Sequence, residues 1–276
     1  MVVDGGEPRN AVSDHVHNVL GQDGIRPSDL LAAGRREAEG YGVRFLEDRV
    51  VVARRDGDRF VLVLLGGATV RARRALLASG LVDELPDVPG LRQFWGSSVL
   101  HCPYCHGWEV RGQRIGILGS GPNSVHQTLM FRQLSPDVTF FQHTLAEVAD
   151  ENLAQFEALG VRVVPGLVQR VSGTDGDLTL DLGDVEEHVQ ALVVAPRFRA
   201  RGNLFAQLGG ELTQHPMGEF VQTGLGGVTD VPGVWAAGNV ADLGAMVTAS
   251  SGAGVLAGAS LNADLIAEDT RALLRP

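Results

Sequence analysis

Apolar residues in the first third of the chain follow first a helical and then a strand-like rhythm. The segment "DLLAAGRREAEGYG" (residues 29–42) has apolar positions at helical spacing and ends at glycine, which predicts a helix. Short apolar runs of strand length follow, and Asp56-Gly57 between two of them is a strong hairpin signal. The predicted strands are 43–46, 50–53, 60–65 and 75–78. This part of the chain is therefore predicted to be a β-meander embedded in an α/β pattern.

A second α/β pattern begins after residue 98. The stretch "PDVPGLRQFWGSS" (86–98) carries prolines and small residues, which predicts a linker. The stretch "RIGILGSGPNSVHQTLMFRQLSPDVTFFQHT" then predicts strand, glycine turn, helix and strand, and "GVRVVPG" and "ALVVAPRF" predict further buried strands. A second break at 195–202 precedes "GVWAAGNVAD" and a small-residue helix within 243–263, which we expect to be packed internally.

Composition narrows the class of protein. A chain of 276 residues, 44% of them hydrophobic, can bury the cores of two ordinary domains. The net charge of -10 argues against nucleic acid or an anionic membrane as a partner. The opening "MVVDGGEPRN" lacks the features of a secretory signal, and 243–263 is too weakly hydrophobic for a membrane span. We therefore expect a cytoplasmic protein.

The loop between residues 115 and 124 predicts a dinucleotide site. Residues 115–118 form the expected strand, Gly119 and Gly121 permit a tight turn and close approach to a pyrophosphate, and Ser124 is the third small residue. The N-terminus of the following helix offers N–H groups to the phosphates. A purely structural turn is the alternative, but the strand, helix and second strand stand in the right order.

The choice between NADH and NADPH stays open at this stage. The cofactor's 2'-position is usually read at the end of the second strand, which here carries Gln142, His143 and Thr144. Neither the acid typical of NAD sites nor the arginine typical of NADP sites stands there.

Cys102 and Cys105, the only cysteines, stand directly ahead of this loop in "HCPYCHGWE". A zinc site needs four ligands, and His101 and His106 beside the pair would rarely complete a tetrahedron, so we predict no metal. A haem attachment, which "CPYCH" also matches, requires an exported protein. Two inert buried cysteines remain an alternative. A redox pair explains the x-x spacing, and electrons passing from nicotinamide to a disulfide call for a flavin as converter.

Several motifs in the same order resemble those of the low-molecular-weight thioredoxin reductases, in the branch that includes dithiol oxidases of natural products. They are "HCPYCHGWE", "GILGSGPNS", "LLASGLVDELPDVPG" in place of an Ala-Thr-Gly segment, and "GVWAAGNVAD". The resemblance implies an α/β fold of two Rossmann-like nucleotide-binding domains. An FAD domain (1–93 and 200–276) would be interrupted by an NAD(P) domain (94–199), and the chain would form a homodimer.

The resemblance also implies roles for individual residues. Gly238 and Asn239 take the place of a Gly-Asp that binds the FAD ribityl-phosphate region, and the helix that follows, near Val247, would approach the flavin ring. The remaining implied FAD contacts are Asp4 at the adenosine ribose, Val50 at the adenine, and Gly80 in the Ala-Ser-Gly segment. His106 would be the proton donor, with Cys105 facing the flavin and Cys102 attacking the substrate.

The implied function is an FAD-dependent NAD(P)H:disulfide oxidoreductase. Electrons would pass from NADPH or NADH through FAD to the Cys102–Cys105 disulfide, and on to a thioredoxin-like protein or a small disulfide; a dithiol oxidase would run the reverse course with oxygen. Compared with the family, a strand–loop–helix of roughly 30 residues is missing before "MVVDGG". A late start site, a fragment, or a real truncation that abolishes flavin binding would explain this, and the first two are favoured. The alternative is a non-catalytic nucleotide-binding remnant that acts in dimerisation or sensing.

Overall fold

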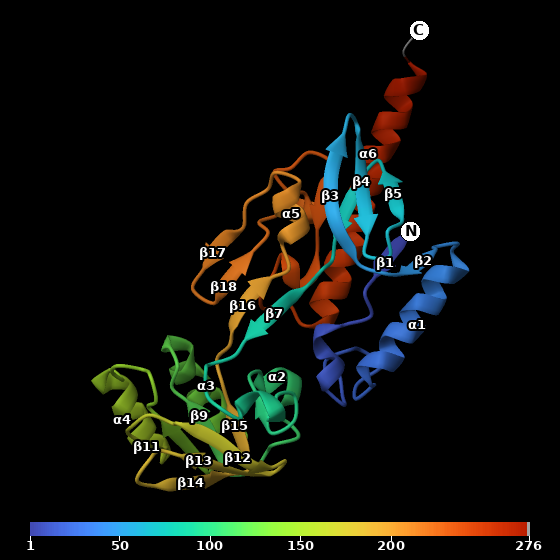
Figure 1. Ribbon diagram of the computed structural model, residues 1–276. Coiled ribbons are helices and arrows are strands. Elements are labelled where there is room, and N and C mark those ends of the chain that lie inside the picture. Colours follow the sequence, from blue (N-terminus) through green and yellow to red (C-terminus); the bar gives the residue numbers. More distant parts are fainter. Residues whose placement is uncertain (275–276) are drawn as a thin grey trace. The chain divides into compact units, whose positions relative to one another are not determined.

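The chain passes four times between two structural units in the computed structural model, which describes residues 1–274 (Figure 1). Unit 1 comprises Met1–Arg9, Ser28–Asp83 and the chain from Phe198 onward, and unit 2 comprises Asn10–Pro27 and Glu84–Arg197. The predicted α/β class is confirmed. Residues 10–27 and 84–93, which the sequence analysis assigned to the first domain, group with unit 2. The nucleotide assigned to each domain stays a prediction.

A parallel five-stranded sheet forms the centre of unit 2, in the order β11-β10-β9-β15-β8. Its strands are β8 (Val99–Leu100), β9 (Ile115–Leu118), β10 (Val138–Phe141), β11 (Arg162–Val164) and β15 (Ala191–Val193). Its helices are α2 (Pro103–His106), α3 (Pro122–Arg132) and α4 (Asp150–Leu159). The strand, glycine turn, helix and strand predicted from residue 114 are all present, and the four residues of β9 and of β10 are buried, as expected for a doubly covered sheet.

An antiparallel sheet completes unit 2. It contains β12 (Arg170–Thr174), β13 (Asp177–Asp181) and β14 (Glu186–Val189). Leu178 and Leu180 of β13 are fully buried in the same core cluster as Leu118 and Leu192 of the parallel sheet. The apolar residues that alternate along β13 therefore join the two sheets into one core.

The predicted linker at 86–98 is wrong in its structural character. It contains a 3-10 helix, Leu91–Phe94, and both of these residues are buried in the core of unit 2. Gly90 makes the close packing possible, because a Cβ there would lie 1.8 Å from the carbonyl oxygen of Val171, and its φ of +86° suits glycine. The prolines that suggested a linker instead shape a packed turn.

Unit 1 combines short parallel pairs with an antiparallel meander and a mixed four-stranded sheet. β1 (Val2–Asp4) pairs in parallel with β2 (Phe45–Glu47), and β6 (Ala75–Leu77) with β19 (Val234–Ala236). The predicted meander is present as β3 (Val50–Asp56), β4 (Arg59–Leu64) and β5 (Thr69–Ala72), with the hairpin at Asp56-Gly57. The four-stranded sheet contains β17 (Thr213–His215), β18 (Gly218–Phe220), β16 (Arg197–Ala200) and β7 (Leu81–Glu84). The helices are α1 (Pro27–Gly40), α5 (Asn203–Gln207) and α6 (Val247–Leu273).

The predicted strand "ALVVAPRF" is two strands of different sheets. β15 ends at Val193 and β16 begins at Arg197, on either side of Pro196. Proline cannot donate a ladder hydrogen bond, and it separates the strands at the last passage between the units.

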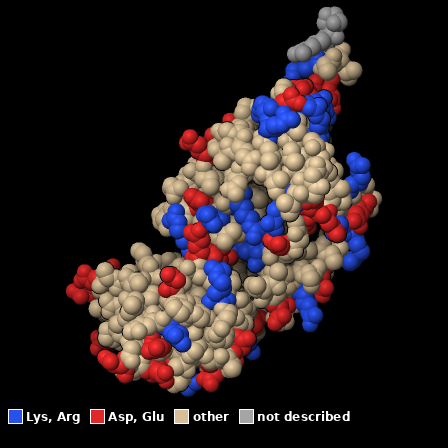
Figure 2. Space-filling view, in the orientation of Figure 1, with Lys and Arg blue, Asp and Glu red and all other residues tan. Residues whose placement is uncertain are grey.

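The small-residue helix α6 is less buried than predicted. Within it only Ala257 is fully buried, against Trp235 and Ala237 in one core cluster, while Leu256 is 64% exposed. Its C-terminal part carries ion pairs of Arg73 and Arg74 with acidic residues, and Figure 2 shows basic and acidic side chains gathered at that end of the chain. The expectation of an internal helix fails because its small residues pack along one stripe only. Among the described helices, none is both long and apolar enough to cross a membrane.

Candidate active site

The two cysteines lie at the start of α2, directly after the end of β8. Their Sγ atoms are 2.7 Å apart and not joined by a covalent bond. The backbone N–H groups of Cys105 and His106 donate to the carbonyl oxygen of Cys102, which holds the x-x turn closed. Cys105 is exposed and Cys102 is half-buried. The pair is therefore placed to form a disulfide with little movement of the chain.

His106 follows Cys105 and is half-buried. Its burial lowers the pKa of the imidazole below its ordinary value, and only the nearby Glu109 and Asp14 carboxylates oppose this shift. His15 and His17 act in the same direction as burial. A histidine in this environment is mainly neutral near pH 7 and can accept a proton from a thiol.

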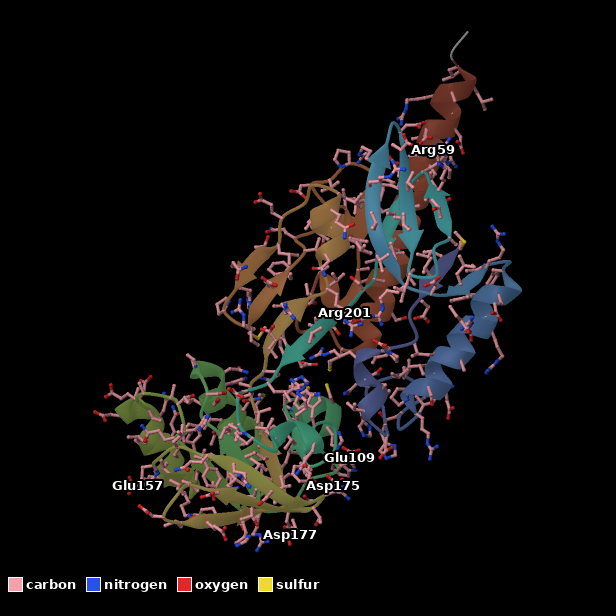
Figure 3. The ribbon with its side chains drawn as sticks, in the orientation of Figure 1. Arg59, Glu109, Glu157, Asp175, Asp177 and Arg201 are labelled. Carbon is pink, nitrogen blue, oxygen red and sulfur yellow. The ribbon has the colours of Figure 1, made fainter. Side chains whose placement is uncertain are left out.

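Sequence reasoning missed a polar cluster that segment 10–27 contributes beside α2. His17 Nε2 is 2.6 Å from Glu109 Oε1, and His17 Nδ1 is 3.2 Å from Asp23 Oδ2. The hydrogen bond with Glu109 raises the pKa of His17. Burial opposes ionisation of Glu109, but the hydrogen bond to His17, a backbone hydrogen bond and the charges of His17 and His106 together outweigh it, and the pKa of Glu109 is lowered. Both shifts indicate an ion pair close to the cysteines; Figure 3 labels Glu109.

The same segment also contacts the backbone between the cysteines. Asn18 Nδ2 donates to the carbonyl oxygen of Tyr104 at 2.9 Å. Tyr104 and Trp108 are 64% and 61% exposed, and Trp95 stacks on His101 with ring centroids 5.6 Å apart. Aromatic residues thus flank the pair in sequence, and two of them are exposed. The contacts join residues far apart in sequence, and no local motif in 10–27 signals them.

The glycine loop after β9 has the geometry of a dinucleotide loop. A Cβ on Gly119 would lie 2.6 Å from the Gln142 carbonyl oxygen, so only glycine fits there. Gly121 precedes α3 and has open space around its Cα. Ser124 is fully buried, and its hydroxyl donates to the Leu118 carbonyl oxygen at 2.9 Å, which ties helix to strand. Ser120 Oγ is buried and has no hydrogen-bond partner.

A pocket of about 680 Å³ opens at this edge of the parallel sheet. Its lining includes Ser120, His143, Thr144, Gln169 and Arg197, which follow β9, β10, β11 and β15. Ligands of doubly wound sheets bind at the carboxyl ends of the strands, at the point where the strand order reverses. In this sheet β9 lies between β10 and β15, so that point is at the carboxyl end of β9. The pocket and the unpartnered Ser120 hydroxyl fit a dinucleotide whose pyrophosphate lies on the loop.

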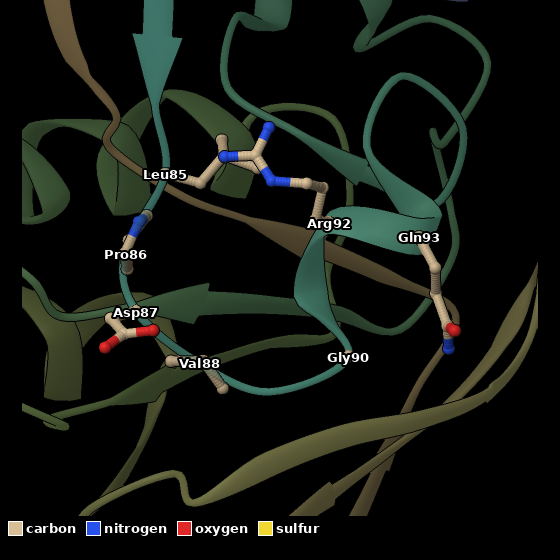
Figure 4. Close-up of a pocket in the computed structure, with 7 residues that line it drawn as sticks. All are labelled: Leu85, Pro86, Asp87, Val88, Gly90, Arg92 and Gln93. Carbon is tan, nitrogen blue, oxygen red and sulfur yellow. The ribbon is translucent and has the colours of Figure 1, made fainter.

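A second pocket of about 550 Å³ lies along the segment that was predicted as a linker (Figure 4). It is lined by Leu85, Pro86, Asp87, Val88, Gly90, Arg92 and Gln93. The first three also line the larger pocket, so the two are neighbours in unit 2.

Gln142 and His143, the two remaining residues predicted for unit 2, follow β10, and their side chains form hydrogen bonds with backbone groups of that unit. Gln142 Nε2 donates to the carbonyl oxygens of Leu145 and Ala146, and His143 Nδ1 accepts from the Val168 N–H at 3.2 Å. Burial lowers the pKa of His143. His143 lines the pocket, and its role at the cofactor's 2'-position stays a prediction.

All six residues predicted to contact FAD lie in unit 1. Asp4 ends β1, is exposed, and accepts a hydrogen bond from the Gly6 N–H at 2.9 Å. Val50 begins β3, and the Gly80 carbonyl oxygen accepts from the Arg201 N–H. A carboxylate held this way at a strand end fits a ribose diol.

Gly238, Asn239 and Val247 surround the start of α6. Gly238 adopts a φ of +74°, and Asn239 Nδ2 donates to the carbonyl oxygens of Asp242 and Ala245. This amide therefore shapes the loop that leads to Val247. No side chain caps α6 at its N-terminus, a dipole end that fits an anionic group.

An arginine that the sequence did not single out completes this region. Arg9 forms two hydrogen bonds with Asp83, and its Nη1 donates to Asn239 Oδ1 at 3.2 Å. Its guanidinium lies 5.1 Å from the Phe198 ring centroid. Among the described residues, no group of three or more His, Cys, Asp or Glu is arranged to hold a metal ion.

Comparison with known proteins agrees with this geometry. The model of the pyridine nucleotide-disulphide oxidoreductase family matches residues 8–254. Thioredoxin reductase tcpT of Claviceps purpurea is 33% identical over 96% of this chain and 87% of its own length. Thioredoxin reductase aclD of Aspergillus oryzae is 30% identical over 91% of this chain and 82% of its own length.

Solved structures extend the likeness to the fold. The crystal structure of HlmI has a TM-score of 0.91 and 41% identity, covering 99% of this chain and 86% of that one. An oxidoreductase from Agrobacterium tumefaciens has a TM-score of 0.90 and 34% identity, covering 96% of this chain and 89% of that one. Proteins of the thioredoxin reductase type use FAD and NAD(P)H.

Proposed function

Because the chain belongs to the pyridine nucleotide-disulphide oxidoreductases, we propose that it exchanges electrons between NAD(P)H and a disulfide or dithiol substrate through FAD and the Cys102–Cys105 pair. One observation carries the proposal. Two thiols 2.7 Å apart lie in the same unit as a strand–glycine turn–helix loop with a buried, unpartnered hydroxyl. Bound FAD supplies the conversion between hydride and electron-pair transfer.

The chemistry of the pair follows from ordinary thiol–disulfide exchange. A cysteine thiolate attacks one sulfur of an external disulfide, forms a mixed disulfide and releases a thiolate that takes up a proton. The second cysteine then attacks the mixed disulfide, which forms the Cys102–Cys105 bond and releases the other thiol. Two electrons have then passed from the pair to the substrate. In the reverse direction the same steps oxidise a dithiol.

His106 is the proposed proton carrier for these steps. It is adjacent to Cys105, and its burial keeps the imidazole mainly neutral, so that it can take the thiol proton and return it to the leaving thiolate. Segment 10–27 positions this region through the His17–Glu109 pair and the Asn18 bond to Tyr104.

The exposed aromatic side chains bear on the substrate. Tyr104, which stands between the two cysteines in sequence, and Trp108 are exposed, and exposed aromatic side chains suit either a small apolar disulfide or a loop of a thioredoxin-like protein. Turnover of oxidised thioredoxin, of a small cyclic disulfide and of the matching dithiol with oxygen separates these sources.

Absorbance spectroscopy of the FAD-loaded protein tests the function. We expect NAD(P)H to bleach the flavin, and substrate disulfide to restore its colour. The double variant C102S/C105S should still be bleached but should lose disulfide turnover. Turnover that survives in the double variant, or a flavin that no nicotinamide reduces, contradicts the proposal. A non-catalytic module would instead bind a nicotinamide nucleotide and fail to bind FAD in calorimetry.

A homodimer is the proposed assembly. Val255, Leu256 and Ile266 on α6 are 69%, 64% and 56% exposed, and a second copy of the chain would cover such a face. We expect Leu256→Glu to lower the sedimenting mass, while Leu20→Glu at a fully exposed loop position should not. An unchanged mass for Leu256→Glu contradicts an interface at this face.

A further inference from the structure

We propose that the larger pocket of unit 2, at the carboxyl ends of the parallel strands, selects a dinucleotide with a free 2'-hydroxyl, of the NADH type, over one with a 2'-phosphate. This inference rests on the proposed function, in which that pocket holds the nicotinamide nucleotide. It concerns only the choice between the two nicotinamide nucleotides, because the residues that carry it stand after β10, where the 2'-substituent is contacted.

The topology places the position that contacts the cofactor's 2'-substituent, here called the reading position, directly after β10. β9 pairs with β10 on one side and with β15 on the other, and the glycine loop follows β9. A pyrophosphate on that loop directs the adenosine ribose toward the end of the second strand. In this chain Gln142, His143 and Thr144 stand there, and the last two line the pocket.

The donors at this position are largely used by the protein itself. The N–H groups of Gln142, His143 and Thr144 donate to the carbonyl oxygens of Val164, Gly166 and Gly119. The Gln142 amide donates to two further carbonyl oxygens. Since His143 Nδ1 accepts from Val168, the neutral ring carries its proton on Nε2. Neutral hydrogen-bond donors such as the Nε2–H of His143 suit a ribose hydroxyl. They carry no positive charge that would compensate a phosphate dianion.

The charges nearby are equally unfavourable for a phosphate. The sequence contains no Lys or Arg between Arg132 and Arg162, while Glu147, Asp150 and Glu151 follow the reading position. Arg132 binds the Leu159 and Ser135 carbonyl oxygens, and Arg162 is paired with Glu187.

Arg197 is the one guanidinium among the residues that line the pocket, and it follows β15, on the other side of β9. Burying a phosphate with no cation at the β10 end would leave its charge uncompensated. The structure therefore favours a hydroxyl at this position.

Calorimetric titration with ADP-ribose and 2'-phospho-ADP-ribose tests this without turnover. We expect ADP-ribose to bind at least about tenfold more tightly. Thr144→Arg should raise the affinity for the phosphorylated compound about tenfold and make it fall with added salt, since it supplies the missing guanidinium. Thr144→Gln, the neutral control, should leave the ratio of affinities unchanged.

The outcomes separate specificity from function. Equal or tighter binding of the phosphorylated compound overturns the inference and leaves the proposed function standing. If Arg197→Gln weakens only the phosphorylated compound, Arg197 reads the 2'-position and the inference is wrong. Equal weakening of both compounds supports it. If neither compound binds to the chain, both the inference and the hydride step of the proposed function fail.

Discussion

Arg9 and Asp83 are joined by two parallel hydrogen bonds, from Nε to Oδ2 at 2.8 Å and from Nη2 to Oδ1 at 2.6 Å. Arg9 is the last residue of its segment in unit 1, Asp83 is the last of the next, and Phe198, which lies under the guanidinium, is the first of the third. One side chain thus fastens three points where the chain leaves or rejoins unit 1. Its remaining bond reaches Asn239.

We expect Arg9→Ala to destabilise the protein by about 2–4 kcal/mol, because the Asp83 side chain is only 8% exposed and would lose its partner. Arg49→Ala is the matched control. It breaks a pair with Glu7 in which both side chains are more than half exposed, and it should cost less than about 1 kcal/mol. Urea unfolding of the two variants measures both values. Equal losses of unfolding free energy would show that the Arg9–Asp83 pair adds no stability beyond that of an ordinary surface pair.

The stability from the His17–Glu109 pair should depend on pH. The pKa of His17 is raised above 6.5, so its contribution is complete below that value and lost as pH rises through the folded pKa. The pKa of Glu109 is lowered below 4.5, so its contribution is complete above that value and lost as pH falls through the folded pKa. The pair therefore stabilises most between 4.5 and 6.5.

His17→Gln should accordingly lose about 1 kcal/mol of unfolding free energy near pH 5.5 and less near pH 8. Comparison with the unchanged protein at each pH removes the opposite contribution of His106, whose pKa is lowered by burial. His188→Gln is the control, since His188 is exposed on β14. A loss that does not vary with pH would mean that His17 contributes by packing alone.

Local patterns predicted the strand, glycine turn and helix at residues 115–132 well, and the surroundings of the cysteines poorly. The turn from β9 into α3 depends on residues within ten positions of one another, and glycine spacing with an apolar run was enough to locate it. His17 and Glu109 are 92 positions apart, and Arg9 and Asp83 are 74 apart. Such pairs leave no periodic trace. The internal position predicted for α6 failed for another reason: small residues permit close packing, but they do not say on how many faces it occurs.

The two loop glycines should respond differently to the same substitution. Gly119→Ala places a Cβ 2.6 Å from the Gln142 carbonyl oxygen and 2.8 Å from that of Phe141, both backbone atoms that cannot move without shifting the strand end. We expect about 1–3 kcal/mol of destabilisation and at least a tenfold loss of ADP-ribose affinity. Gly121→Ala meets no atom within 4 Å, and its φ of 176° is extended backbone, so its stability should change by less than about 0.5 kcal/mol.

Calorimetry and thermal unfolding of both variants supply the readout. Because a methyl group at position 121 faces the space where a pyrophosphate would approach, Gly121→Ala should weaken binding while it keeps stability. A Gly121→Ala variant with full affinity would show that the phosphates do not lie against this residue.

The two thiols should differ in reactivity when each is isolated. In the variant Cys102→Ser the exposed Cys105 sulfur remains, and in Cys105→Ser the half-buried Cys102 sulfur remains. We expect a maleimide to modify the first variant several-fold faster, because access to the sulfur limits the reaction along with its thiolate fraction. Both rates are measured by mass spectrometry on reduced protein. His106→Gln in the Cys102→Ser background should slow the reaction near pH 7, since the neutral imidazole can no longer take the thiol proton. An unchanged rate would remove His106 from the role of proton acceptor for Cys105, while the difference in access between the two sulfurs would stand on its own.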